Sequence, residues 1–162
     1  MIRTLFALTL VVSLGFASFS QNKQDQSDPV SAQAVLKKRQ TGTDGKETWS
    51  VEVVLEIEKG WHIYANPAGD EVFVPTVVTV GGIAKDDVEV AYPKGIVHRD
   101  ETIQVVAYHY EGKTVIPVTV RRPLVNGKPD PQPLEITVRY QACSDLRCLA
   151  PKTVKLTVSP AK

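Results

Sequence analysis

The stretch 49–58, WSVEVVLEIE, places an apolar side chain at every second position. Alternation with a period of two is typical of a β-strand that has one buried and one solvated face. The same alternation returns near the C-terminus, in 134–140 and 154–158. The side chains that we expect in the core are Trp49, Val51, Val53, Leu55, Ile57, Ile136, Val138, Leu156 and Val158.

Shorter β-rich runs occupy 72–80, 88–92, 104–110 and 114–120, and turn-forming residues separate them, as in 42–45 and 126–129. No long window has a helical stripe of apolar residues. About eight short strands at this spacing predict an all-β fold, an immunoglobulin-like antiparallel β-sandwich. A closed barrel stays open as an alternative, because alternation does not say how the sheets meet.

The N-terminal segment has the composition of a secretory signal peptide. Arg3 supplies a positive start, 5–16 is almost wholly apolar, and the small residues Ala17, Ser18 and Ser20 follow. The apolar run is too short to span a bilayer, although an uncleaved anchor is the alternative. We therefore predict a signal peptide at 1–20, a flexible linker at 21–28 and one exported, periplasmic-type domain at 29–162.

Charge and composition exclude several classes of partner. The 19 basic and 18 acidic residues leave a net charge of +1, which gives no reason to expect binding to nucleic acid or to an anionic membrane. There is no glycine-rich phosphate loop and no serine in a nucleophile-elbow sequence. We expect a monomer without a cofactor.

The two cysteines, Cys143 and Cys148, directly follow the strand predicted at 134–140. They can close a disulfide around about six residues, which in the chain-entropy model contributes about 2 kcal/mol. Spacing alone favours an inert bridge, because exported sandwiches often carry one. Two details favour a redox-active bridge: Arg147 promotes a Cys148 thiolate, and a very small loop invites strain. Asp145 opposes the effect of Arg147, so two interpretations stay open: a redox-active bridge, and the structural bridge of a non-catalytic exported binding or adaptor module.

His62, His98 and His109 are single histidines, scattered along the sequence at a spacing that suits no metal motif. A zinc site needs more ligands than the two cysteines supply, so we predict no metal site. Copper carriage by Cys143 and Cys148 with one histidine is chemically possible in an exported protein and is the lesser alternative.

The stretch 140–151, YQACSDLRCLAP, resembles the cysteine loop in the N-terminal periplasmic domain of the DsbD family of thiol:disulfide interchange proteins. The segment 60–64, GWHIY, is similar to an aromatic segment of the same domain. The stretch 110–118, which ends in VIPV, is similar to the strand that precedes its final hairpin. Together these segments span nearly the whole chain from about Val30.

This resemblance implies an immunoglobulin-like oxidoreductase domain that passes electrons between thioredoxin-fold partners. In the family, a thioredoxin-like domain fed through a membrane domain is the donor, and disulfide isomerases and cytochrome c assembly factors are the acceptors. By position, Cys148 would form the mixed disulfide and Cys143 would resolve it. This sequence contains neither a membrane domain nor a thioredoxin-like domain, so we expect a separate donor protein that provides the link to the membrane.

The resemblance also implies residues that surround the disulfide. Trp61 and Tyr64 would line the cysteine pocket, although aromatic residues in a sandwich more often belong to the core. The family's cap loop shields the disulfide with an aromatic ring, but the matching segment 98–103, HRDETI, has none. The expected cap residues are Asp100, Glu101, Thr102 and Ile103, with Thr102 or Ile103 over the sulfurs. Ala150 also stands where the family often has a proline.

Overall fold

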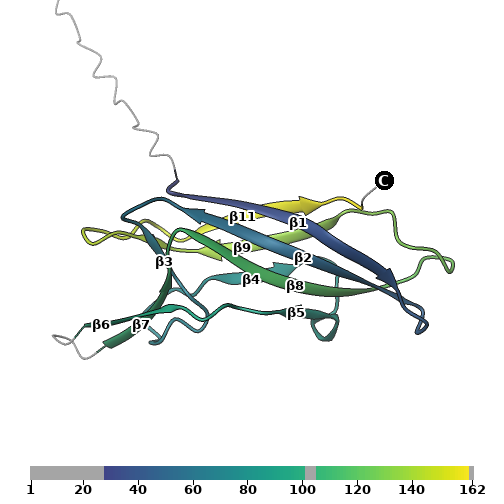
Figure 1. The fold of residues 1–162 in the computed structure, drawn as a ribbon, viewed down its shortest axis with the longest axis horizontal. Helices are drawn as coiled ribbons and strands as arrows, with labels where there is room; N and C mark the ends of the chain where they lie inside the picture. The colour runs from purple at the N-terminus through teal and green to yellow at the C-terminus, as the bar shows by residue number, and fades with distance from the viewer. Residues whose placement is uncertain (1–27, 101–104, 161–162) are drawn as a thin grey trace, which may run out of the picture.

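The computed structural model describes residues 28–100 and 105–160 (Figure 1). These residues form eleven β-strands and one 3-10 turn, η1 (Lys85–Asp87). The strands are β1 (Val30–Thr41), β2 (Lys46–Ile57), β3 (His62–Tyr64), β4 (Val77–Val80), β5 (Val88–Val90), β6 (Ile96–Asp100), β7 (Val105–Tyr110), β8 (Lys113–Pro123), β9 (Leu134–Tyr140), β10 (Ala142–Cys143) and β11 (Lys152–Val158). The described part of the chain contains no helix long and apolar enough to cross a membrane.

The strands form three antiparallel sheets with the orders β1-β2-β8-β5, β11-β9-β4 and β10-β3-β7-β6. The first two run lengthwise through the molecule, and β3, β6 and β7 lie toward one end of it (Figure 1). The predicted all-β, antiparallel sandwich is therefore confirmed. The sheets are open, so the barrel alternative is wrong.

The core lies between the inward faces of β2, β8 and β9. In the β2–β8 pairing Val51 lies opposite Val118 and Val53 opposite Ile116, so their side chains share one face, and all four are buried. All the predicted core side chains are buried except Leu156, which is half-buried because β11 is an edge strand of its sheet. The long alternating strands thus build the core as the sequence predicts.

The predicted strand at 72–80 is shorter in the structure and begins only at Val77. The carboxylate of Asp70 accepts a hydrogen bond from the Val72 N–H (3.0 Å), and the Asp70 carbonyl accepts one from the Phe73 N–H (3.3 Å). These bonds close a turn in which a side chain takes the place of a strand partner. The turn carries Phe73 toward the end of the molecule where β3 and β7 lie.

Three short strands, β3, β6 and β10, lie where the sequence pattern predicted none, and the long strand β1 also lies outside the predicted runs. Residues 98–100, expected in the cap loop, belong to β6 and pair with β7, with His98 opposite Ala107. Two to five residues are too few to display a period of two, which explains why alternation did not reveal them. Together with β7 these short strands form the third sheet.

The predicted signal peptide and all of the predicted linker except Asp28 lie outside the described residues. Asp28, expected to end the linker, is instead tied to the sandwich. Its carboxylate accepts hydrogen bonds from the Tyr140 hydroxyl (2.6 Å) and the Val30 N–H (3.0 Å) and pairs with Lys152 (2.5 Å). Burial raises the pKa of Asp28, but these bonds and the Lys152 charge together outweigh burial and hold the pKa below its ordinary value. The ordered domain therefore includes Asp28.

Candidate functional site

One face of the third sheet gathers the polar and aromatic side chains of the site. Cys143 on β10 lies opposite His62 on β3, and Tyr64 on β3 lies opposite His109 on β7. Residues opposite each other in an antiparallel pair project from the same face, and alternate residues of one strand do so too. The intervening Ile63 therefore faces the other way and is fully buried in the core. The pairing register alone thus brings four of the site residues to one surface.

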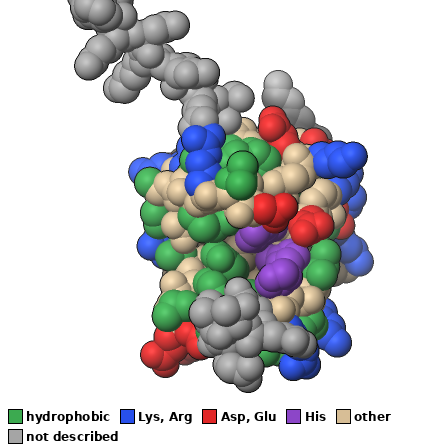
Figure 2. Space-filling view, turned by 90° about the vertical axis from the view of Figure 1, so that its left-hand side faces the viewer, with side chains coloured by type: hydrophobic (Ala, Val, Ile, Leu, Met, Phe, Trp, Pro, Cys, Tyr) green, Lys and Arg blue, Asp and Glu red, His purple; other side chains and the backbone are tan. Residues whose placement is uncertain are grey.

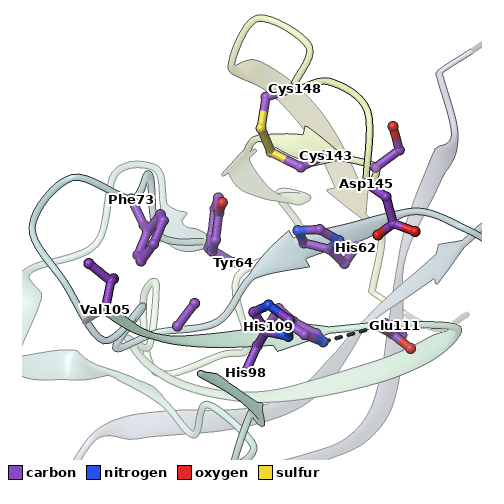
Figure 3. A pocket seen from close by; sticks show the side chains of 12 residues that line it. His62, Tyr64, Phe73, His98, Val105, His109, Glu111, Cys143, Asp145 and Cys148 are labelled. Carbon is purple, nitrogen blue, oxygen red and sulfur yellow. Dashed lines mark ion pairs between the residues drawn. A yellow bond between two sulfur atoms is a disulfide. The ribbon is translucent and has the colours of Figure 1, made fainter. Parts of the chain in front are cut away.

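These side chains line a cavity of about 390 Å³ at the end of the molecule (Figure 3). Figure 2 shows histidine side chains in a hollow on this end face, with acidic side chains beside them. The lining residues are His62, Tyr64, Phe73, His98, Val105, Ala107, His109, Glu111, Cys143, Ser144, Asp145 and Cys148.

Cys143 and Cys148 are joined by a disulfide at the neck of a tight loop, with their Cα atoms 4.0 Å apart. The Ser144 N–H donates to the Arg147 carbonyl (2.8 Å), which closes the loop. Below the bridge, the Leu149 N–H donates to the Ala142 carbonyl (2.8 Å). Backbone hydrogen bonds therefore hold the loop on both sides of the bridge, and its shape does not depend on the disulfide alone.

The two cysteine residues differ sharply in exposure. The Cys143 side chain belongs to β10 and is only 1% exposed, whereas Cys148 follows the loop and is exposed. A macromolecular thiol approaching from solvent therefore meets the Cys148 sulfur. Cys143 is the less accessible of the two from solvent.

The aromatic residues predicted for the pocket take different places. Tyr64 lines the cavity and stacks on Phe73, with ring centroids 4.4 Å apart. Trp61 does not line it; its half-buried ring packs against the core and has the Arg147 guanidinium 5.8 Å from its centroid. Trp61 thus contacts the cysteine loop, through Arg147, from outside the cavity. Arg147 is directed to this ring, an arrangement that sequence proximity to Cys148 could not predict.

Phe73 is a lining residue that the sequence analysis missed. Its turn is held against β7 by a close backbone approach at Gly69, which has φ +106°. A Cβ at this position would lie 2.2 Å from the Val106 carbonyl oxygen. Only glycine fits there. Gly69 was a signal of a special backbone position in the sequence. The sequence alone does not show, however, that the turn packs against β7.

The three histidines are not scattered in the structure, so that interpretation of the sequence is wrong. The ring centroids of His62 and His109 are 4.9 Å apart, and those of His109 and His98 are 6.0 Å apart. They come from β3, β7 and β6, which are neighbours in one sheet. Within residues 28–100 and 105–160, however, no group of three or more His, Cys, Asp and Glu side chains is arranged to hold a metal ion.

The titratable side chains near the disulfide lie at different distances from it. His109 is buried and its Nε2 lies 3.0 Å from the Glu111 carboxylate. His62 lies between this pair and the cysteines (Figure 3). Burial lowers the pKa of His62, and the imidazole of His109 lowers it further, while Glu111 and Asp145 act in the opposite direction. Because the net shift is downward, His62 is mainly neutral at neutral pH.

The expected cap residues cannot be placed at the disulfide. The backbone of Asp100 ends β6, while Glu101, Thr102 and Ile103 lie outside the described residues. Their role over the sulfurs stays a prediction.

Reducing the bridge should lower the free energy of unfolding by about 2 kcal/mol and leave a cooperative melting transition. The reason is that the bridge closes a very small loop, which backbone hydrogen bonds also hold, and that the core lies elsewhere. Thermal melts with and without dithiothreitol measure the difference. Cys148→Ser is the control, because reductant should not shift its melt. Loss of the cooperative transition would instead identify a bridge on which the fold depends.

Fold and site together define an all-β domain with a disulfide at its surface, set in a cavity lined by titratable groups. The sequence matches the family model described as thiol:disulfide interchange protein DsbD, N-terminal, over residues 28–160. The chain therefore belongs to this family, and the predicted resemblance is confirmed. Its members are thiol:disulfide exchange domains, and the cysteine pair that such exchange requires is present.

A solved structure supports the fold. The crystal structure of the N-terminal periplasmic domain of ScsB from Proteus mirabilis is similar to this chain, with a TM-score of 0.50 and 14% sequence identity. The similarity covers 80% of this chain and 52% of that chain, so the present chain corresponds to about half of it. The search of curated proteins finds no match.

Proposed function

We propose that this chain is an exported domain that passes electrons between thioredoxin-fold proteins by reversible opening of the Cys143–Cys148 disulfide. The periplasm is the compartment proposed for it, by analogy with its family and with the relative described as periplasmic. The proposed donor is a thioredoxin-fold partner, and cytochrome c assembly factors are among the proposed acceptors.

The observation that carries the proposal is the unequal exposure of the two cysteine residues. Exchange needs one sulfur that a partner thiolate can reach and a second thiol that attacks only from within. Cys148 is exposed and Cys143 is 1% exposed. An inert bridge does not require one exposed and one buried cysteine. A bridge that forms one defined mixed disulfide does require this difference.

The reaction follows from this division. In reduction of the domain, a donor thiolate attacks the Cys148 sulfur, the bond to Cys143 breaks, and Cys143 leaves as a thiolate that takes up a proton. The second donor thiol then attacks the mixed disulfide and releases Cys148. Two electrons pass to the domain, and the donor leaves as a disulfide. Transfer to an acceptor runs through the same steps in reverse, with Cys148 as the attacking thiolate.

The surface around Cys148 is suited to a protein partner. Leu146, at the tip of the cysteine loop, is 95% exposed. Exposed apolar side chains beside a reactive group lose water when a partner docks, which favours association. A small-molecule thiol gains nothing from such contacts. Protein and small-molecule reductants should therefore depend differently on Leu146.

The test compares reduction of the bridge by reduced thioredoxin with reduction by dithiothreitol, followed by acid quenching and mass spectrometry. The wild-type bridge should react with both. Leu146→Ser should slow the reaction with thioredoxin about tenfold, because a buried leucine side chain contributes about 1.5 kcal/mol or more. The reaction with dithiothreitol should keep its rate.

Val125→Ser is the matched control for this experiment. Val125 is also an exposed apolar residue, 48% exposed, but it follows β8, at the opposite end of the sandwich from the cysteine loop. Its substitution should change neither rate. A wild-type bridge that thioredoxin reduces no faster than an unrelated surface disulfide would contradict the proposed function.

A further inference from the structure

His62 has a relation to Cys143 that no other histidine of the site has. The two residues lie directly opposite each other in the β10–β3 pairing, and both side chains line the same cavity. Directly opposed residues of an antiparallel pair have Cβ atoms about 4.5–5.5 Å apart. Figure 3 shows the His62 ring beside Cys143, with His109 and His98 on the side away from the cysteines.

We propose that His62 is the general base that takes the proton from Cys143 when this thiol resolves the mixed disulfide. This inference rests on the proposed exchange function and adds to it a residue that acts in one step only. Cys143 needs such a base more than Cys148 does. It is buried, and burial in the protein favours the neutral thiol over the thiolate.

The proposed step balances in protons and electrons. The domain begins as a mixed disulfide through Cys148, with Cys143 as a thiol. His62 takes the thiol proton, the Cys143 thiolate attacks the Cys148 sulfur, and the bond from Cys148 to the partner breaks. The partner leaves as a thiolate and receives the proton from the His62 imidazolium. In this step the Cys143 sulfur is oxidised by one electron and the partner sulfur is reduced by one, and the Cys148 sulfur gave up the other electron when the mixed disulfide formed.

The surroundings of His62 suit a base at neutral pH. From β7 and the residue that follows it, His62 is faced by His109 and Glu111, from β6 by His98, and from the cysteine loop by Asp145. Burial and the nearby imidazoles hold its pKa below the ordinary value of 6.5, so a lone pair is free to accept the proton. The two carboxylates stabilise the imidazolium once it forms.

The test separates the two steps of exchange. Reduced protein is mixed with oxidised glutathione, and formation and decay of the mixed disulfide are followed by acid quenching and mass spectrometry from pH 5 to pH 9. In His62→Gln the decay should be about 100-fold slower at pH 6–7, the usual size of general-base catalysis. The difference should shrink toward pH 9, because the thiol then ionises without help. Formation at Cys148 should stay within about twofold of wild type.

His62→Phe keeps an aromatic ring against Tyr64 and His109 but accepts no proton, so it should behave as His62→Gln does. A melting curve for each variant verifies the fold. Decay at the wild-type rate in both variants, or equal slowing of formation and decay at every pH, would overturn the role of His62. A wild-type protein that forms no mixed disulfide at all would instead overturn the exchange function on which the inference rests.

Discussion

Replacing Cys143 with serine should trap a mixed disulfide between Cys148 and a thioredoxin-fold partner. In wild type we expect a short-lived mixed disulfide, because the Cys143 thiol should attack the Cys148 sulfur and release the partner. Serine removes that attack and leaves Cys148 exposed at the end of its loop. We expect a covalent adduct to accumulate to a large fraction of the protein, where the wild type shows little. Non-reducing electrophoresis and mass spectrometry measure the adduct.

Cys148→Ser is the matched control for this trapping experiment. The remaining thiol, Cys143, is 1% exposed and lies within β10, so a folded partner cannot reach it. Little adduct should form. The same amount of adduct with both variants, or none with either, would contradict the roles assigned to the two cysteines. This one pair of variants thus tests both the exchange reaction and which of the two cysteines forms the mixed disulfide.

The second large effect is expected far from the cysteines, at Glu47 on β2. This carboxylate is fully buried, accepts a hydrogen bond from Arg39 Nε (2.5 Å), and accepts another from the Asp130 N–H (3.1 Å). Asp130 in turn pairs with Arg122, and the guanidinium carbons of Arg39 and Arg122 each lie 4.9 Å from the centroid of the Trp49 ring. Glu47 therefore joins β1 and the loop before β9 to the core.

Glu47→Ala should lower the free energy of unfolding by about 3 kcal/mol, since removing one member of a buried charge pair strands its partners. Glu52→Ala is the control on the same strand: Glu52 pairs with Lys37 in a partly exposed ion pair, and its loss should cost less than about 1 kcal/mol. Urea denaturation of both variants measures the difference. Equal losses in the two variants would show that Glu47 does not organise this end of the sandwich.

This effect should depend on pH. Burial raises the pKa of Glu47, but the hydrogen bonds that its carboxylate accepts, with that from Arg39 the largest, and the Arg39 charge together outweigh burial and hold the pKa below the ordinary value of 4.5. A depressed folded-state pKa means that the stabilisation is present above pH 4.5 and is lost as the pH falls through the lower value. The difference in the free energy of unfolding between wild type and Glu47→Ala should accordingly become smaller in acid.

The parts of the fold that the sequence predicted correctly are those with long alternating strands. β2 has an apolar side chain at every second position from Trp49 to Ile57, which is enough to predict the buried face of that stretch residue by residue. β3 and β10 have 3 and 2 residues, and no pattern can be read from such lengths. Their existence follows from pairing, which is a property of the folded chain.

The same reason explains what could be predicted of the site. The cysteine pair was predicted because its two members are close in sequence. His62, His98 and His109 meet only through the register of three strands, and a spacing of 11 to 36 residues along the chain conceals that. Phe73 reaches the cavity through a turn whose place depends on the contact of Gly69 with β7. The chemistry of the site was thus visible in the sequence, whereas its surroundings required the tertiary structure.

The measurement that tests the central claim most directly is the reduction potential of the Cys143–Cys148 pair, obtained by redox titration with a mass readout of the bridged fraction. A domain that exchanges electrons with thioredoxin-fold partners should equilibrate with them, at roughly −180 to −270 mV. A value well below roughly −300 mV, where structural disulfides commonly lie, would contradict the account. The domain would then be a binding module with an inert bridge.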